Sequence, residues 1–244
     1  QRLERIKALT AALVDPDRQL AVLAALAGLA VPEQQADAEA LLGEIRTALR
    51  SVGDVDRREY ALGKLAEVVA GVGRLDLAEP LARAIAVPDR RAAALCMLAR
   101  RLDRAGRRDE AMPMLTEAET LAGDTMDPER RARAQRDVVG VLAAVGERER
   151  AETLAGQITD PVQQGRALNR LARAELADGH WDRAAALIRQ VTDRDVRDRG
   201  LADLALRAAD DRRLDRAEPL AREIADPGLR VRTLGGITDR MDRR

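Results

Sequence analysis

Small and aliphatic residues recur along this chain at a nearly constant interval. One position of each repeat, usually a glycine, serves here as a marker. An alanine follows each marker by five residues, and a leucine or methionine follows that alanine by three. Successive markers lie 33 or 40 residues apart. The difference is about two helical turns, which nearly preserves a buried face. A period of this size predicts a repeat array. The markers are Glu33, Gly73, Gly106, Gly146, Gly179 and Arg212, and the alanines are Ala38, Ala78, Ala111, Ala151, Ala184 and Ala217.

Each repeat is predicted to hold two amphipathic helices. Past Ala184, for example, Leu187 and Val191 continue one apolar stripe. The recurring alanine itself predicts a point where two helices cross closely. The other helix opens with Asp-Pro in several repeats, and we expect Asp to cap this helix and Pro to occupy its first turn. These helix starts are at Asp15, Asp127, Asp160 and Asp226.

Three prolines share one position in the second helix of their repeats, namely Pro80, Pro113 and Pro219. A proline inside a helix costs about 3 kcal/mol, because it removes a backbone donor and clashes with the preceding turn. We therefore expect the second helix to start late, with the proline in its first turn.

Together these patterns predict an all-α chain, an α-solenoid of about seven antiparallel helix-turn-helix repeats. The 40-residue intervals predict longer second helices around residues 33–51 and 107–123. We expect residues 1–244 to form a single array that is a fragment of a longer protein, because it begins and ends inside a repeat without a polar cap. The alternative is that the uncapped ends pair in a homo-oligomer.

The repeat pattern also resembles a known family. The residues that carry the resemblance are Leu168, Leu171, Ala172, Gly179, Trp181, Ala184 and Ile188, whose order is similar to the tetratricopeptide repeat (TPR) signature. The resemblance covers nearly the full length. It implies a right-handed superhelix in which the second, fifth and ninth positions of each first helix face a concave groove. Another helical-hairpin solenoid, such as HEAT, is the alternative.

Composition narrows the classes of function. The chain holds 42 basic and 42 acidic residues, so no net charge attracts nucleic acid or a membrane surface. No apolar run approaches the roughly 20 residues that span a bilayer. Cys96 is the single cysteine, so no intramolecular disulfide can form, and we expect a cytoplasmic protein. Phenylalanine is absent, which thin helical layers of alanine and leucine tolerate.

No residues combine into a catalytic, cofactor or metal site. Zinc needs three or four ligands, and His180 is the only histidine, so we expect it to be an exposed turn residue. Cys96 has no histidine in repeat phase to activate it and is expected to be a packed or half-exposed residue of a helix. Trp181 is expected to pack within its own repeat. Tyr60 is expected either to line the groove or to pack.

One set of polar residues repeats at the groove positions. Arg133, Arg166, Arg199 and Arg232 lie 33 residues apart at the second position that the resemblance assigns. The fifth position adds Arg136 and Asn169, and the ninth adds Arg100 and Arg173. Because arginine matches carboxylates in a bidentate manner, the resemblance implies an acidic peptide or C-terminus as the guest. The alternative is that these arginines pair with neighbouring Asp and Glu across repeats.

The sequence therefore favours a non-catalytic protein–protein interaction scaffold, whose partner is a protein or peptide. A sensor or regulatory region of a larger bacterial signalling ATPase or transcription regulator is the second hypothesis. Nucleic-acid binding through the arginines is a third, which zero net charge and the scarcity of aromatic residues disfavour. An enzyme is the least favoured, because no catalytic set can be assembled.

Overall fold

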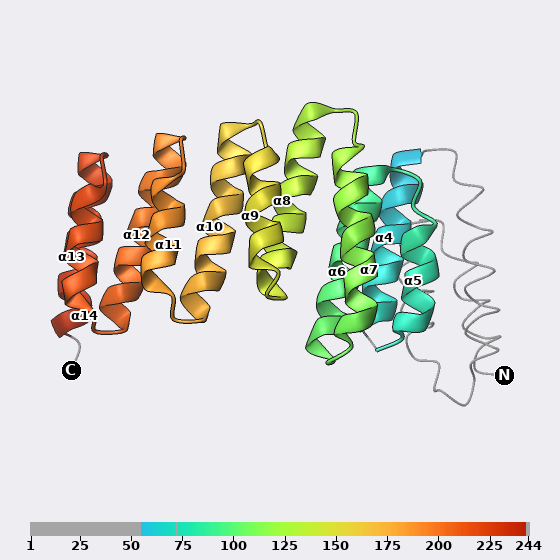
Figure 1. Ribbon diagram of the computed structural model, residues 1–244, viewed down its shortest axis with the longest axis horizontal. Coiled ribbons are helices and arrows are strands. Elements are labelled where there is room, and N and C mark those ends of the chain that lie inside the picture. Colours follow the sequence, from blue (N-terminus) through green and yellow to red (C-terminus); the bar gives the residue numbers. More distant parts are fainter. Residues whose placement is uncertain (1–54, 72, 243–244) are drawn as a thin grey trace, which may run out of the picture. The chain divides into compact units, whose positions relative to one another are not determined.

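The computed structural model describes residues 55–71 and 73–242. This part of the chain is entirely helical and contains no strand. The helices are α4 (Val55–Gly71), α5 (Leu75–Arg83), α6 (Pro88–Arg104), α7 (Arg108–Gly123), α8 (Pro128–Ala144), α9 (Arg148–Gln157), α10 (Pro161–Ala177), α11 (Trp181–Arg189), α12 (Arg194–Asp210), α13 (Leu214–Glu223) and α14 (Pro227–Asp242) (Figure 1). The predicted helices before residue 55 lie outside the described residues.

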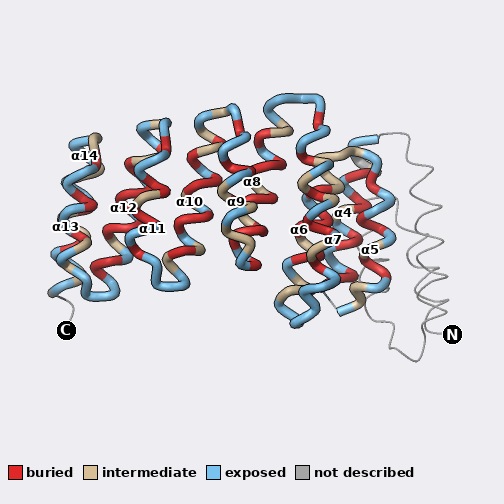
Figure 2. Tube along the Cα trace, in the orientation of Figure 1, coloured by how far each residue is buried: buried red, intermediate tan, exposed pale blue. Residues whose placement is uncertain are grey.

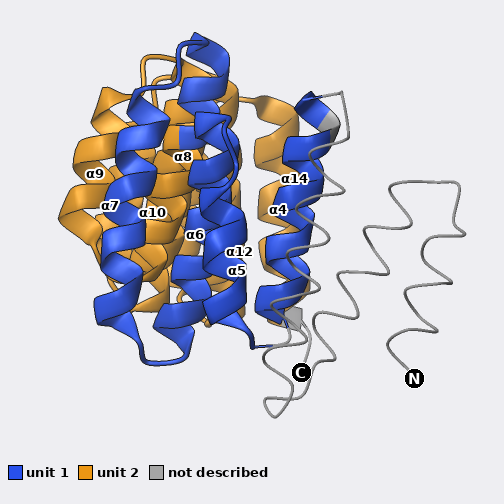
Figure 3. Ribbon diagram, turned by 90° about the vertical axis from the view of Figure 1, so that its right-hand side faces the viewer, with its two compact units in different colours: residues 1–134 blue, residues 135–244 orange. Residues whose placement is uncertain are grey.

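The chain divides into two compact units, residues 1–134 and 135–244, with the boundary inside α8 (Figure 3). In the first unit α4 packs on α5 and α6, and α6 packs on α7. In the second unit α10 packs on α9, α11 and α12, and α12 packs on α11, α13 and α14. The helices that pack together thus lie one or two steps apart along the chain, so the fold is an α-solenoid. The right-handed superhelix and the single array stay predictions.

Long first helices alternate with short second helices. The helices α4, α6, α8, α10 and α12 each have 17 residues. The second helices α5, α9, α11 and α13 have only 9 or 10 residues. The second helix α7 is the exception with 16 residues, which confirms the longer helix predicted around 107–123.

Aspartates start the first helices as predicted. The Asp160 carboxylate accepts a hydrogen bond from the backbone N–H of Gln163 at 2.7 Å, and Asp127 accepts one from Arg130 at 2.8 Å. Asp193 does the same for Val196 at 2.8 Å, although no proline follows it. The capping side chain satisfies a donor that has no partner within the helix.

The marker residues form the turns between paired helices. Gly73, Gly106, Gly146 and Gly179 all have positive φ, between 75° and 87°. Arg212 takes the same place with φ of 58°, a conformation that costs a side-chain-bearing residue more than glycine. The glycines therefore recur because the turn of each helical hairpin requires one residue in the left-handed backbone conformation.

The predicted late start of the second helices is wrong. Pro80 lies inside α5, Pro113 inside α7 and Pro219 inside α13, each five residues after the helix begins. All three prolines are exposed. Because the missing hydrogen bond lies on the solvent side, water can reach the freed carbonyl, and the buried face of the helix holds the turn.

The predicted crossing alanines form the centre of the core. Ala78, Ala111, Ala151, Ala184 and Ala217 are each 0% exposed. Buried residues follow the inner faces of the paired helices, and exposed residues follow the outer faces (Figure 2). An alanine here lets two helix backbones approach closely, so the layers pack without aromatic volume.

Candidate functional site

Two arginines at equivalent repeat positions anchor the candidate site. Arg166 lies near the start of α10, and Arg199 lies at the same position of α12, 33 residues later. Both residues are exposed. The two helices pack against each other, so the sequence period brings both guanidinium groups to one face of the second unit.

A cavity of about 280 Å³ opens on this face, and we call it the arginine hollow. Five of the eight predicted groove residues line it, namely Arg136, Arg166, Asn169, Arg173 and Arg199. Arg170 also lines it, although the groove positions did not include it. A signal for Arg170 does exist in the sequence, because Asp137, Arg170 and Asp203 alternate in charge at one position of successive repeats.

Ion pairs neutralise only part of the charge in the arginine hollow. Arg136 and Arg170 both contact Asp137, with nitrogen–oxygen distances of 2.9 and 2.7 Å. Arg136 also donates to Gln163 Oε1 at 2.7 Å. Arg136 is thus paired within its own helix, and the pairing across repeats here involves Arg170, which was not a predicted groove residue.

Arg173 pairs with Asp203 across the α10–α12 contact. This pair is weak, since the side chains are 71% and 59% exposed and water screens them. Arg166 and Arg199 have no carboxylate partner among the described residues. Five guanidinium groups thus face two carboxylates, and three positive charges remain for an incoming anion.

The other three predicted groove residues do not line this cavity. Arg133 belongs to the first unit and pairs with Glu129 one turn earlier in α8. Arg100 is exposed on α6, and Arg232 is exposed on α14. The structure therefore gathers five of the eight residues into one hollow and leaves these three outside it.

Asn169 marks a close approach of α10 and α12 at the edge of the hollow. Its Nδ2 donates to the Val196 carbonyl at 3.2 Å, while its Oδ1 is buried without a hydrogen-bond partner. A Cβ placed on Gly200 would lie 2.5 Å from that oxygen. Glycine is therefore the residue that fits, because a side chain here would require Asn169 to move.

A larger hollow of about 530 Å³ adjoins the arginine hollow, and we call it the aliphatic hollow. The two share Asn169, Arg173, Gly200 and Asp203 in their linings. Aliphatic side chains from three helices form much of its wall, namely Ala172, Leu176, Ala177, Ile188, Leu204 and Leu206. The sequence patterns did not indicate this hollow, because its wall combines buried residues with the half-buried Leu176 and Leu206 and the exposed Ala177.

Buried carboxylates position the repeats behind these surfaces. Asp198 is 2% exposed and accepts hydrogen bonds from the backbone N–H groups of Ala225 at 3.2 Å and Asp226 at 2.8 Å. Glu59 does the same in the first unit, for Ala86 at 2.6 Å and Val87 at 3.4 Å. Sequence reasoning missed both residues. Their signal is an acid at the repeat position that Ala92, Ala132 and Gly165 occupy in the repeats between them.

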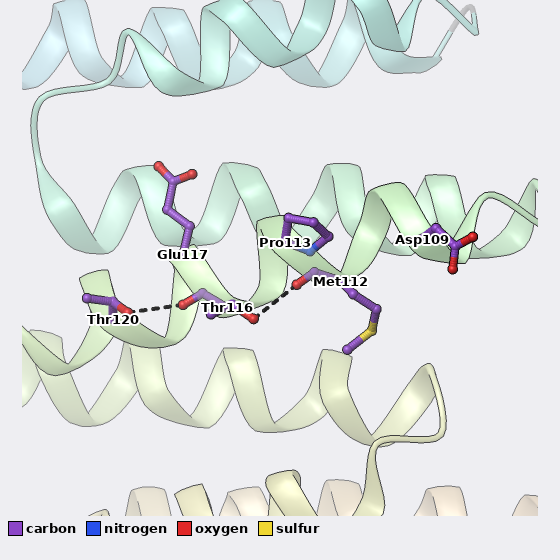
Figure 4. A pocket seen from close by; sticks show the side chains of 6 residues that line it. All are labelled: Asp109, Met112, Pro113, Thr116, Glu117 and Thr120. Carbon is purple, nitrogen blue, oxygen red and sulfur yellow. Dashed lines mark hydrogen bonds between the residues drawn. The ribbon is translucent and has the colours of Figure 1, made fainter.

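A further hollow, of about 650 Å³, lies along the outer face of α7 in the first unit (Figure 4). The hydroxyls of Thr116 and Thr120 point back along α7 and donate to the carbonyls of Met112 and Thr116, at 3.2 and 3.1 Å. Glu117 pairs with Arg83. The two threonine hydroxyls and Glu117 are thus already bonded within the unit, and the side chains do not converge on a common point.

The remaining candidate residues lie as follows. His180 is the residue before α11, its side chain is 62% exposed, and its Nδ1 lies 2.8 Å from Glu175 Oε2. Cys96 and Trp181 are buried, while Tyr60 is 61% exposed on α4. In the described ranges no three His, Cys, Asp or Glu side chains cluster as metal ligands. Nor does any helix there combine the length and hydropathy needed to cross a bilayer.

Comparison with known proteins gives no family. No family model matches the chain, and no curated protein matches it. Among solved structures, the chain is similar to Ton1535 from Thermococcus onnurineus NA1, with 14% sequence identity, a TM-score of 0.27, and coverage of 96% of this chain and 98% of that one. The tetratricopeptide resemblance stays a prediction.

Proposed function

We propose that the chain is a non-catalytic interaction scaffold, TPR-like in kind, that binds an acidic segment of a partner protein in the arginine hollow. The observation that carries the proposal is the surplus of positive charge in one concave place. Arg166 and Arg199 lie in a lined hollow and have no carboxylate partner among the described residues. Outside the hollow, many arginines of neighbouring repeats are already paired, as Arg189 is with Glu223 at 2.6 Å.

The chemistry of the hollow favours carboxylates. Arginine presents a planar fork of donors that matches a carboxylate with two parallel hydrogen bonds. Two forks on adjacent helices can bind two acidic side chains, or one side chain from both sides. A protein segment is the natural guest of a solenoid, since consecutive repeats present a long regular surface. The cytoplasm is the proposed compartment, which the single cysteine supports.

Fluorescence anisotropy tests the proposal. The probe is a short labelled peptide of glycine and serine with two adjacent glutamates, and its matched control carries two glutamines instead. We expect the glutamate peptide to bind and the glutamine peptide to bind at least about tenfold more weakly. We also expect binding to weaken between about 50 and 500 mM salt, because solvent ions screen exposed charges.

Two double variants test whether peptide binding depends on the arginine hollow or only on the overall charge of the protein. Arg166→Ala with Arg199→Ala removes the two arginines without a carboxylate partner. Arg194→Ala with Arg222→Ala removes the same charge from exposed positions of the second unit that line neither hollow. The first pair is expected to weaken peptide binding at least about tenfold, and the second to change it little. Equal losses in both pairs, or tighter binding of a labelled DNA single strand than of the peptide, would refute the proposal.

A further inference from the structure

The geometry points to a second subsite for the same guest. We infer that the aliphatic hollow binds an uncharged aliphatic side chain of the acidic segment, about three residues from the acid that the arginine hollow binds. This inference rests on the proposed function and names the kind of partner more closely. The guest is an extended segment that combines acidic and aliphatic residues, and not a purely acidic tract.

The first support is that the two hollows are continuous. Residues of α10 and α12 belong to both linings, among them Asn169 and Gly200, which lie against each other. All of these residues lie in the second unit. A chain bound in the arginine hollow therefore reaches the aliphatic hollow along one surface.

The second support is the difference in charge between the hollows. The lining of the aliphatic hollow also includes arginines, but Arg240 is paired with Asp210 at 2.7 Å, and Arg173 is paired with Asp203. Arg207 lies near Asp211, with a nitrogen–oxygen distance of 3.5 Å. An acidic side chain consequently gains little there, whereas it gains the surplus charge of the arginine hollow.

The third support is that the wall of the aliphatic hollow is accessible. Ala177 is exposed at the end of α10, and Leu176 and Leu206 are half-buried. Leu204 and Ile188 are buried behind them. The volume of about 530 Å³ falls in the range of about 300–1,000 Å³ that is usual for binding pockets. Covering this wall with an aliphatic side chain removes apolar surface from water on both partners.

The separation of the hollows determines the spacing in the guest. The lining of α10 shifts by about one helical turn, roughly 5 Å, between the two hollows. The aliphatic hollow also extends towards α14, and neighbouring packed helices lie about 8–10 Å apart. The centres are therefore on the order of 10 Å apart. An extended peptide covers about 3.3 Å per residue, so about three residues connect the two subsites.

Anisotropy with designed peptides tests the inference. The probes are the labelled glutamate peptide and versions with leucine three residues before or after the glutamates. In the full chain we expect one leucine version to bind about five- to tenfold tighter than the version with serine at that position. Moving the leucine next to the glutamates is expected to remove most of the gain. Equal affinity of every leucine and serine version would overturn the inference.

A variant that fills the aliphatic hollow tests whether the leucine side chain binds there. Ala177→Trp places a ring in the aliphatic hollow from an exposed position and leaves the arginines intact. Ala144→Trp is the matched control, because Ala144 is the exposed last residue of α8, 33 residues earlier, and lines neither hollow. Circular dichroism confirms that both variants remain helical. Ala177→Trp is expected to abolish the preference for leucine while leaving the binding of the serine peptide unchanged, and Ala144→Trp to preserve the preference.

The outcomes distinguish this inference from the proposed function. If glutamate peptides bind through Arg166 and Arg199 but the leucine preference is absent, the inference fails and the proposed function stands. The inference fails too if the preference survives Ala177→Trp. If no glutamate peptide binds at all, both fail. A leucine preference that Ala177→Trp removes and Ala144→Trp retains supports the inference.

Discussion

Replacing Asp198 with alanine is the sharpest test of how neighbouring repeats are joined. The carboxylate of Asp198 is buried in α12 and accepts two backbone hydrogen bonds from the segment between α13 and α14, at 3.2 and 2.8 Å. Its oxygens are acceptors for Ala225 and Asp226, which begin the next repeat. Asp198→Ala removes both acceptors at once and leaves a small void at the junction.

The expected cost follows from these two bonds. A hydrogen bond to a charged group contributes about 1.5–3 kcal/mol, so two contribute roughly 3–6 kcal/mol when both donors are fully desolvated. Ala225 is only half-buried and Asp226 is exposed, so water can replace part of the loss. We therefore expect Asp198→Ala to lower the free energy of unfolding by about 2–4 kcal/mol. Asp198→Asn retains one acceptor oxygen, and we expect about half that loss.

Urea unfolding of the full chain measures the effect. Trp181, the only tryptophan, is buried in α11 of the same unit and reports on its unfolding by fluorescence, alongside far-ultraviolet circular dichroism. Asp195→Ala is the matched control, because Asp195 is exposed in the first turn of the same helix, and we expect it to cost less than about 1 kcal/mol. Hydrogen exchange at the amides of Ala225 and Asp226 should accelerate in Asp198→Ala alone. Equal stabilities of the Asp198 and Asp195 variants, with unchanged exchange, would refute the reasoning.

Three further predictions concern the same unit. Asp203→Asn should tighten binding of the glutamate peptide about two- to fivefold in anisotropy, because it frees an exposed arginine and removes a negative charge from the hollow, and weaker binding would contradict this. Gly200→Ala should destabilise the protein by about 1–3 kcal/mol, since its Cβ would lie 2.5 Å from Asn169 Oδ1, and an unchanged melting temperature would contradict this by showing that the Asn169 side chain can move aside. The hydrogen bond from Arg216 at 2.5 Å lowers the pKa of Asp182 below its ordinary range. The ionised Asp182 carboxylate therefore contributes to stability at neutral pH, and this contribution is lost as the pH falls through the lowered pKa. Carboxyl NMR titration should show the pKa of Asp182 returning towards its ordinary value in Arg216→Ala, and identical titrations in both proteins would contradict the assignment.

Much of the fold could be predicted because its signals are local. The left-handed turn at Gly179 requires glycine, and the cap at Asp160 requires a short acceptor side chain, so each leaves a mark at one position of the period. The prediction that the second helices start late at the prolines was wrong for a local reason as well. The free-energy cost of proline in a helix is lower at these positions, because Pro80 and its counterparts face water and the carbonyl that loses its hydrogen bond can be hydrated.

The candidate site was predictable only in part. The period places Arg166 and Arg199 on equivalent positions of packed helices, which is why both line the arginine hollow. The period could not show that Asp137 of α8 contacts Arg170 of α10, because that depends on how side chains reach between the two helices. The same applies to the aliphatic hollow, whose wall combines residues of several helices.

The sequence by itself determined the helical repeat, its turns, its capped helix starts and its alanine crossings, since these follow from backbone preferences and from which residues share a helix face. Only the tertiary structure decided which arginines are neutralised, which residues of α10 and α12 lie against each other, and where the surface is hollowed. Those features depend on distances between side chains about 30 residues apart in the chain, as between Arg173 and Asp203, and the packing of neighbouring helices sets such distances.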